Sequence, residues 1–211
     1  VGLYDPSRIR TTTANGAAGT LEANEAGVPR LEGELNISLS QLSEGSNLAI
    51  SGMYQEAQPT ADGAGGKEVE AKGIHVGGTL VGGPVALTAH YYNGECLGIT
   101  LQMDSGAMSA DGNCRDHDGY YVQGTYNYGA GKLGVSWGGS YQDQAGDDVG
   151  QGTYDTKKEQ EMYTFGIYHN LAPEWLAVAE YSHATEDWYD KDTGDEEGES
   201  DIFAVGMFYL W

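Results

Sequence analysis

Positive charge and long apolar runs are both scarce in this sequence. It has 10 Lys and Arg against 32 Asp and Glu, which gives a formal net charge of −22 at pH 7. We expect no nucleic-acid partner, because binding to phosphates needs a basic surface. No stretch approaches the ~18 consecutive apolar residues that a transmembrane helix requires. The mean hydropathy of −0.46 is typical of a soluble chain, but strands that alternate polar and apolar residues across a membrane give a similar average.

Cysteine and phenylalanine are also rare, whereas glycine and tyrosine are abundant. The chain has two Cys and 3 Phe, but 33 Gly and 15 Tyr. Cys96 and Cys114 lie in one stretch rich in Gly and Asp, and we predict that they form a disulfide in an oxidising compartment. A buried, reduced pair is the alternative. The sequence shows no signal peptide and no initiator Met, so we expect a mature chain or a fragment.

Polar and apolar residues alternate with a period of two along most of the chain, and helical periodicity is almost absent. In segment 30–40, RLEGELNISLS, the Leu, Gly and Ile residues share one face, and the charged and polar residues share the other. The same pattern predicts nine antiparallel strands, at 30–40, 47–55, 68–80, 85–92, 120–128, 132–141, 161–170, 175–183 and 201–211. Segment 7–11 is a candidate tenth strand.

Short turns and long polar loops follow one another in strict alternation. The short turns lie near 42–46, 81–84, 129–131 and 171–174, and the long loops near 12–29, 56–67, 93–118, 142–160 and 184–200. Aromatic residues also gather on the apolar faces at both strand ends. Near the long loops these are Tyr54, Tyr91, Tyr120, Tyr141, Tyr163, Tyr181 and Phe203; at the other ends they are Tyr126, Tyr128, Trp175, Tyr209 and Trp211.

These two features together predict the fold class. Long loops at one end of the strands, short turns at the other end and two aromatic belts are typical of an all-β, transmembrane antiparallel β-barrel with short periplasmic turns and long extracellular loops. Strand 68–80 is ambiguous, because Glu70 and Lys72 share a face with Ile74 and Val76. Either a bulge intervenes or both charges stand above the membrane.

The last strand carries a family resemblance. Its apolar residues occupy every second position and end on an aromatic residue: Phe203, Val205, Met207, Tyr209 and Trp211. This pattern resembles the C-terminal assembly signal of the general porins of Gram-negative outer membranes, which usually end in Phe. Segment 163–182 resembles the penultimate hairpin of these porins, although Ala172, Pro173 and Glu174 replace a turn that is usually polar and basic.

The resemblance implies a passive channel for small hydrophilic solutes and ions in the outer membrane, with no enzymatic chemistry and no cofactor. It also implies a homotrimer that contacts outer-membrane lipid and lipopolysaccharide and is inserted by the barrel-assembly machinery. Porins have ~16–18 strands. We therefore expect residues 1–211 to be a single β-barrel domain that forms the C-terminal portion of a larger porin. A complete ten-stranded barrel is the alternative.

Charged and polar residues on the polar strand faces are the candidate selectivity residues, because channels select ions with rings of such side chains. We predict that the pore is lined by Arg8, Arg10, Arg30, Glu32, Glu34, Asn36, Gln123, Thr125, Asn127 and Glu180. Arg8 and Arg10 share a face if 7–11 is extended, and in porins such a basic ladder faces an acidic loop. An ordinary polar wall without a special site is the alternative. The acid excess predicts a preference for cations over anions.

The acidic loop 185–201 is a candidate for cation binding. Asp190, Asp192 and Asp195 place oxygen ligands near alternate positions, as Ca²⁺ loops do, but without the spacing of an EF-hand. Calcium at the extracellular loops is therefore a prediction, and a solvated acidic loop is the alternative.

Two other classes of protein stay open. One ten-stranded outer-membrane family consists of proteases with Asp and His at the barrel mouth, and an adhesin could use the same scaffold. His183 with Asp187, and His117 with Asp116 and Asp118, lie near the predicted mouth. Their spacing matches no catalytic motif. A soluble β-rich binding protein is the remaining alternative.

Overall fold

The structure, a computed structural model, describes residues 1–4, 10–12, 18–20, 29–57, 68–98, 106–109, 112–146, 156–190 and 194–209. Ten antiparallel strands form one sheet: β1 (Gly2–Tyr4), β4 (Arg30–Ser38), β5 (Asn47–Ala57), β6 (Val69–Gly82), β7 (Val85–Glu95), β8 (Asp116–Asn127), β9 (Gly131–Gln142), β10 (Thr156–Ala172), β11 (Trp175–Asp190) and β12 (Gly194–Tyr209). Two further short strands, β2 (Arg10–Thr12) and β3 (Ala18–Thr20), pair only with each other.

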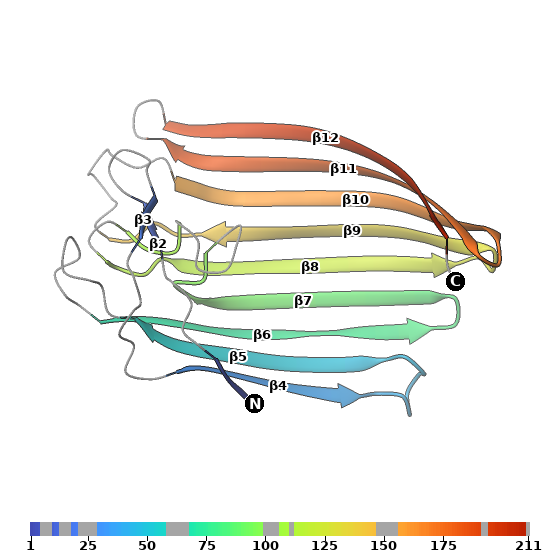
Figure 1. Cartoon of the computed structure of the whole chain (residues 1–211), viewed down its shortest axis with the longest axis horizontal. Helices are drawn as coiled ribbons and strands as arrows, with labels where there is room; N and C mark the ends of the chain where they lie inside the picture. Colours follow the sequence, from blue (N-terminus) through green and yellow to red (C-terminus); the bar gives the residue numbers. More distant parts are fainter. Residues whose placement is uncertain are drawn as a thin grey trace.

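The ten strands lie side by side in chain order and form a curved wall (Figure 1). The tight turns between β4 and β5, β6 and β7, β8 and β9, and β10 and β11 all lie at one end of this wall, which we call the turn end; the opposite end is the loop end. Within the described ranges β12 does not pair with β1. The described residues form no helix, and so none that could cross a membrane.

All nine predicted strands are present, so the all-β antiparallel class is confirmed. The tenth strand of the sheet was wrongly predicted. Gly2–Tyr4 takes that place and pairs with β4, with Tyr4 opposite Arg30. Part of the predicted strand 7–11 instead forms β2 in the separate two-stranded sheet. Pro6 follows β1 closely and has no N–H to donate to a ladder, which disfavours a strand that continues through it.

The predicted loop 184–200 is mostly strand, which is a second correction. β11 continues to Asp190 and β12 begins at Gly194, with regular pairing from Asp190 opposite Gly194 onwards. The charges in this segment suggested a solvated loop, but Thr185, Trp188 and Tyr189 all favour strands. The acidic segment therefore extends the last hairpin beyond the aromatic residues at the loop end.

The cross-strand register places the apolar residues on one face of the sheet. Leu35 lies opposite Ile50, Ile50 opposite Val76, and Val76 opposite Tyr91. This face is exposed: its apolar residues include Leu35, Ile50, Val76, Leu87, Val122, Val135, Phe165, Phe203 and Val205, the last of which is 87% exposed. So extended an exposed apolar surface indicates contact with lipid.

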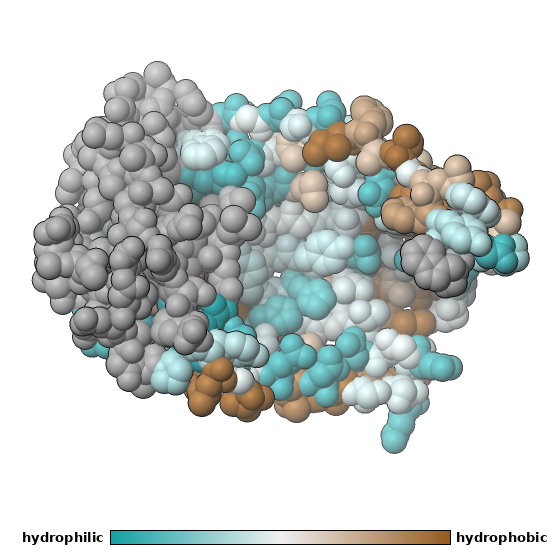
Figure 2. Space-filling view, viewed as in Figure 1, coloured by the Kyte–Doolittle hydropathy of each residue, from teal (hydrophilic) through white to brown (hydrophobic). Residues whose placement is uncertain are grey.

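The opposite face is polar and concave, and we call it the inner face. Figure 2 shows a hollow in the middle of the molecule, lined by pale and teal residues, with brown residues at its rim and toward the turn end. Glu34, Ser51 and His75 lie opposite one another across β4, β5 and β6 on this face. The alternation in the sequence therefore separates an apolar outer surface from a polar inner one.

Aromatic rings cluster on the outer face at both ends of the wall. At the loop end the centroids of Tyr120 and Trp137 are 5.1 Å apart, and those of Tyr181 and Phe203 are 4.9 Å apart. At the turn end Trp175 lies 5.1 Å from Tyr209. This is the arrangement of two interfacial belts, in which amphipathic rings lie between lipid and water. Trp211 lies outside the described residues.

The register also narrows the ambiguity of strand 68–80. β5 and β6 pair without a shift from Ala57 opposite Val69 to Asn47 opposite Thr79, so no bulge intervenes. Glu70 and Lys72 are on the outer face at the loop end, at or beyond the level of Tyr54. Lys72 is bonded there to Glu95, at 3.0 Å. The bulge is therefore excluded between β5 and β6, and the position of both charges above the membrane stays a prediction.

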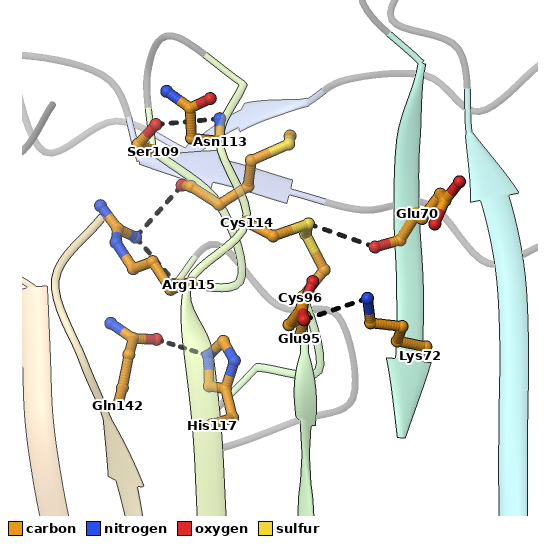
Figure 3. Close-up of a disulfide and its surroundings, with 12 residues drawn as sticks. Glu70, Lys72, Glu95, Cys96, Ser109, Asn113, Cys114, Arg115, His117 and Gln142 are labelled. Carbon is orange, nitrogen blue, oxygen red and sulfur yellow. Dashed lines mark hydrogen bonds and ion pairs between the residues drawn. A yellow bond between two sulfur atoms is a disulfide. The ribbon is translucent and has the colours of Figure 1, made fainter. Parts of the chain in front are cut away.

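The connection between β7 and β8 folds over the inner face at the loop end. Cys96 and Cys114 form a disulfide with a Cα–Cα distance of 4.8 Å (Figure 3). Ala107 and Met108 of this connection are buried against the inner residues Val69 and Ala71. The connection therefore narrows the space inside the wall.

Hydrogen bonds hold this connection in a fixed shape. The Arg115 guanidinium is only 1% exposed and donates through Nη1 to the carbonyls of Gly106 (2.9 Å) and Met108 (3.1 Å). Cys96 has a φ of 57°, a left-handed conformation that is uncommon outside glycine. It turns the chain out of β7 at the point where the disulfide begins.

We predict that a lysine on the outer face destabilises the protein far more than a lysine on the inner face. Val122 and Gln123 are neighbours on β8, but Val122 belongs to the apolar outer row and Gln123 to the polar inner face. Val122→Lys should lower the free energy of unfolding in phospholipid vesicles by about 2–4 kcal/mol, and Gln123→Lys by much less. Denaturant titration followed by tryptophan fluorescence measures both. Equal losses would contradict the assignment of the faces.

We predict that removal of the disulfide loosens the connection between β7 and β8. Because Cys96 and Cys114 are 18 positions apart, Cys96→Ser with Cys114→Ser should lower the free energy of unfolding by about 3 kcal/mol through greater freedom of the unfolded chain. Denaturant titration in detergent measures this loss, and limited proteolysis should cut within 97–113. The wild-type protein treated with reductant is the control, because reduction opens the same bond without a substitution. An unchanged midpoint and protease pattern would show that the bond does not fasten this segment.

Candidate channel lining

The inner face is organised in transverse rows, because antiparallel pairing places side chains of successive strands at the same level. One row, here the hydroxyl row, consists of Asn47, Thr79, Thr88, Gln123, Ser136, Thr164 and Ser182. Its hydroxyls bond to one another: Thr79 with Thr88 at 2.9 Å, and Thr164 with Ser182 at 2.7 Å. The hydroxyl row is therefore polar and uncharged across seven strands.

A second row, closer to the loop end, carries charge. We call it the Glu34–Glu186 row, and it consists of Glu34, Ser51, His75, Tyr92, Gly119, Ser140, Gln160 and Glu186. Within it the Tyr92 hydroxyl donates to Ser140 Oγ at 3.0 Å, across a glycine. A carboxylate lies at each end of this row, on β4 and on β11.

The two carboxylates of this row have different surroundings. Glu186 is bonded to Lys157 Nζ at 2.8 Å, and the same ammonium lies 5.2 Å from the centroid of the Trp188 ring. Glu34 is exposed and has no ion pair among the described residues. Glu34 also lines a cavity of about 700 Å³ together with Glu32, Ser51, His75 and Tyr92. An unneutralised carboxylate therefore faces this water-accessible space.

A third group of polar residues lies nearer the turn end. Thr125 and Glu180 belong to one row, connected through two glycines on β9 and β10. The Tyr168 hydroxyl donates to the Glu180 carboxylate. Lys132 Nζ lies 5.2 Å from the centroid of the same Tyr168 ring. Asn127 accepts a hydrogen bond from the backbone N–H of Gly129 at 2.9 Å, so its side chain helps to form the turn.

The sequence-predicted residues on the sheet share the inner face but do not form one cluster. Arg30 and Glu32 form an ion pair with each other next to β1. Asn36 lies opposite Ala49, at the level between the hydroxyl row and the Glu34–Glu186 row. Arg8 lies outside the described residues, and Arg10 belongs to β2. The predicted ladder of Arg8 and Arg10 on a wall strand is therefore wrong for Arg10, because β2 is not part of the ten-stranded sheet.

Sequence reasoning missed several polar residues of the inner face: Ser51, His75, His90, Tyr92, Lys132, Lys157, Tyr168 and Glu186. Most of them lie on predicted strands, at every second position, on the polar face of the strand. Applying the two-residue alternation to segment 68–80 would have found His75, because it lies between the outer residues Ile74 and Val76. Lys157 and Glu186 lie in segments that were read as loops.

The predicted calcium ligands are not tested by the described residues, and the catalytic candidates lie apart on the two faces of the sheet. Asp192 lies outside the described residues, and no group of three or more His, Cys, Asp or Glu residues among them could hold a metal ion. His117 is on the inner face, where it is bonded to Gln142 at 2.8 Å, and its neighbours Asp116 and Asp118 are on the outer face. His183 is bonded to Asp201 at 2.9 Å on the outer face.

Negative charge is dense at the loop end outside the inner rows. Directly before β6, a hydrogen bond from the protonated Glu68 carboxyl to Glu56, followed by the negative charge of Glu56, raises the pKa of Glu68. Carboxylates that crowd in this way attract cations from solution.

Residues 4–188 match a family described as Gram-negative porin. No curated protein and no solved structure matches the chain. The matched segment covers most of the 211 residues and ends within β11, so it does not include the predicted assembly signal at 203–211. Together with the antiparallel sheet, its apolar outer face and its polar inner face, this match shows that the chain belongs to the Gram-negative porin family and forms a β-barrel wall in the outer membrane.

Proposed function

We propose that the protein forms a water-filled, cation-preferring channel for the passive diffusion of small hydrophilic solutes and ions. The observation that carries this proposal is the polarity of the inner face, where the hydroxyl row and the Glu34–Glu186 row consist mainly of hydroxyl, amide, imidazole and carboxylate residues. The level between these two rows is less polar and includes Ala49 and Met162. Water and solutes can exchange hydrogen bonds with the two polar rows. The apolar outer face, in contrast, has the character of a lipid contact.

The width of the channel depends on small inner residues and on the connection between β7 and β8. Gly77, Gly134, Gly138 and Gly166 lie at inner positions of three strands, β6, β9 and β10. Glycine in a strand interior brings no side chain into the lumen. At the loop end, by contrast, the disulfide-closed connection lies over the inner wall. We expect the narrowest part of this wall at that level.

Cation preference follows from a small number of inner carboxylates rather than from the net charge of −22. Arg30 neutralises Glu32, and Lys157 neutralises Glu186. Lys132 lies close to Tyr168, whose hydroxyl donates to the Glu180 carboxylate. Glu34 is the inner carboxylate without such a neighbour among the described residues. Because salt screens charges beyond ~10 Å at 0.1 M, Glu34 should act more strongly on permeating ions than the carboxylates on the outer face.

The assembly and lipid partners of this channel stay predictions. We expect a homotrimer, insertion by the barrel-assembly machinery and contact with outer-membrane lipid and lipopolysaccharide. The exposed apolar positions of β12 support insertion and lipid contact, with Phe203 and Val205 fully on the outer face. Calcium at the acidic segment 185–201 also stays a prediction.

Reversal potentials in planar bilayers across a KCl gradient test the proposal. Glu34→Gln should lower the cation-to-anion permeability ratio about twofold at low salt, because one charge at ~7 Å in water changes local ion energies by roughly RT. Glu199→Gln, an equal charge change on the exposed outer face of β12, is the matched control and should leave the ratio nearly unchanged. Equal effects of both variants would remove Glu34 from the selectivity filter, and absence of conductance from folded protein would overturn the channel.

A further inference from the structure

Two histidines meet on the inner face between β6 and β7. His75 lies opposite Ser51 on one side and Tyr92 on the other. His90 lies opposite Gly77, so the two imidazoles are diagonal neighbours on the same face of the sheet. Both side chains are half-buried rather than sealed from the lumen.

The two rings meet edge to edge. His75 Nε2 is 2.8 Å from His90 Nδ1. The ring centroids are 5.0 Å apart and the ring planes differ by 13°. Rings stacked face to face would have closer centroids. Since these rings are nearly parallel and their nitrogens are at hydrogen-bond distance, they lie side by side instead. The two nitrogens therefore point at each other at hydrogen-bond distance.

Neighbouring residues fix this arrangement. Ser51 Oγ is 3.2 Å from His75 Nδ1. If His75 carries its proton on Nδ1 and donates it to Ser51, its Nε2 presents a lone pair toward His90. Gly77 provides the room for the second ring, since a Cβ at this position would collide with the imidazole of His90.

The pair borders two open cavities, one of which is also lined by carboxylates. His75 lines the cavity of about 700 Å³ that also contains Glu32 and Glu34. His90 lines an adjoining cavity of about 500 Å³ with Tyr92 and Tyr121. Carboxylates near an imidazole pair raise the local concentration of cations, including divalent ones.

We propose that His75 and His90 form a binding site for a divalent transition-metal ion of the Zn²⁺, Ni²⁺ or Cu²⁺ class in the channel wall. Neutral imidazole nitrogen is a preferred ligand for these ions. His75 Nε2 and His90 Nδ1 bind the metal, while the proton of His90 moves to its Nε2, on the other side of the ring. Ser51 holds His75 in the required tautomer, as outer partners of metal-binding histidines commonly do.

Metal binding requires the two nitrogens to separate and both rings to tilt, because lone pairs that now point at each other must converge on the ion. Two Zn–N bonds of ~2.0–2.1 Å at a tetrahedral angle place the nitrogens about 3.3 Å apart, about half an ångström more than their present distance. Water completes the coordination, because the described residues contain no set of three or more His, Cys, Asp or Glu ligands. The site is consequently open, reversible and weaker than a structural zinc centre.

Zinc titration of the purified, disulfide-intact protein by calorimetry in detergent, at mildly alkaline pH, tests the site. We expect one Zn²⁺ per chain, with the affinity lowered at least about tenfold in His75→Asn and in His90→Asn, and about tenfold in Ser51→Ala. His169→Asn is the matched control, because His169 is bonded to Tyr128 near the turn end. Circular dichroism and heat-dependent gel mobility confirm that each variant is folded.

A further variant separates metal binding from a general effect of losing histidine. Gly77→Ala keeps both imidazoles but displaces the ring of His90, so it should weaken Zn²⁺ binding as His90→Asn does. Binding that is unchanged in His75→Asn, His90→Asn and Gly77→Ala would overturn the site. An equal loss in His169→Asn would overturn it as well.

The consequence for transport rests on the proposed channel, whereas metal binding does not. In planar bilayers Zn²⁺ should reduce the single-channel current of the wild type and of His169→Asn, but not that of His75→Asn. Histidine-dependent binding without any conductance in the absence of metal would support the site and contradict the proposed channel. Conductance without histidine-dependent binding would support the channel and overturn the site.

Discussion

The backbone ladder between neighbouring strands is the interaction on which the rest of this structure depends. In lipid every backbone N–H and C=O group must find a partner within the protein, and continuous antiparallel pairing supplies these partners. From β4 to β9 the pairing runs without a shift, and β11 pairs with β12 in the same regular way. Since side chains alternate along each strand, a slip of one residue would exchange the two faces. The ladder therefore fixes both where lipid lies and what lines the interior.

The inner face derives its properties from what this ladder brings to the same level. Hydroxyl groups on neighbouring strands, such as Thr79 with Thr88, satisfy each other and leave an uncharged polar row. Charges occur in pairs, as in Lys157 with Glu186, so that few carboxylates act on the interior unopposed. The connection closed by Cys96 and Cys114 adds a second layer at the loop end. Polarity, charge balance and width thus have separate structural origins.

Alternation in the sequence predicted the strands and their faces, because a two-residue period is a property of each strand alone. It placed Glu34, Gln123 and Glu180 on the polar face correctly. The extended hairpin around Trp188 was missed because its charges outweighed its strand-forming residues. The contact between His75 and His90 could not be predicted, since a diagonal contact depends on the register between two strands.

The most direct test of this account is a scan of solvent contact along β8. Single cysteines at positions 120–126, each carrying a nitroxide label, would be measured in bilayers with oxygen and with a water-soluble paramagnetic chelate. The account predicts that contact with the chelate peaks at Tyr121, Gln123 and Thr125, and contact with oxygen at Val122 and Gly124. Accessibility without a two-residue period, or with the two sets exchanged, would contradict a wall with lipid on one side and water on the other.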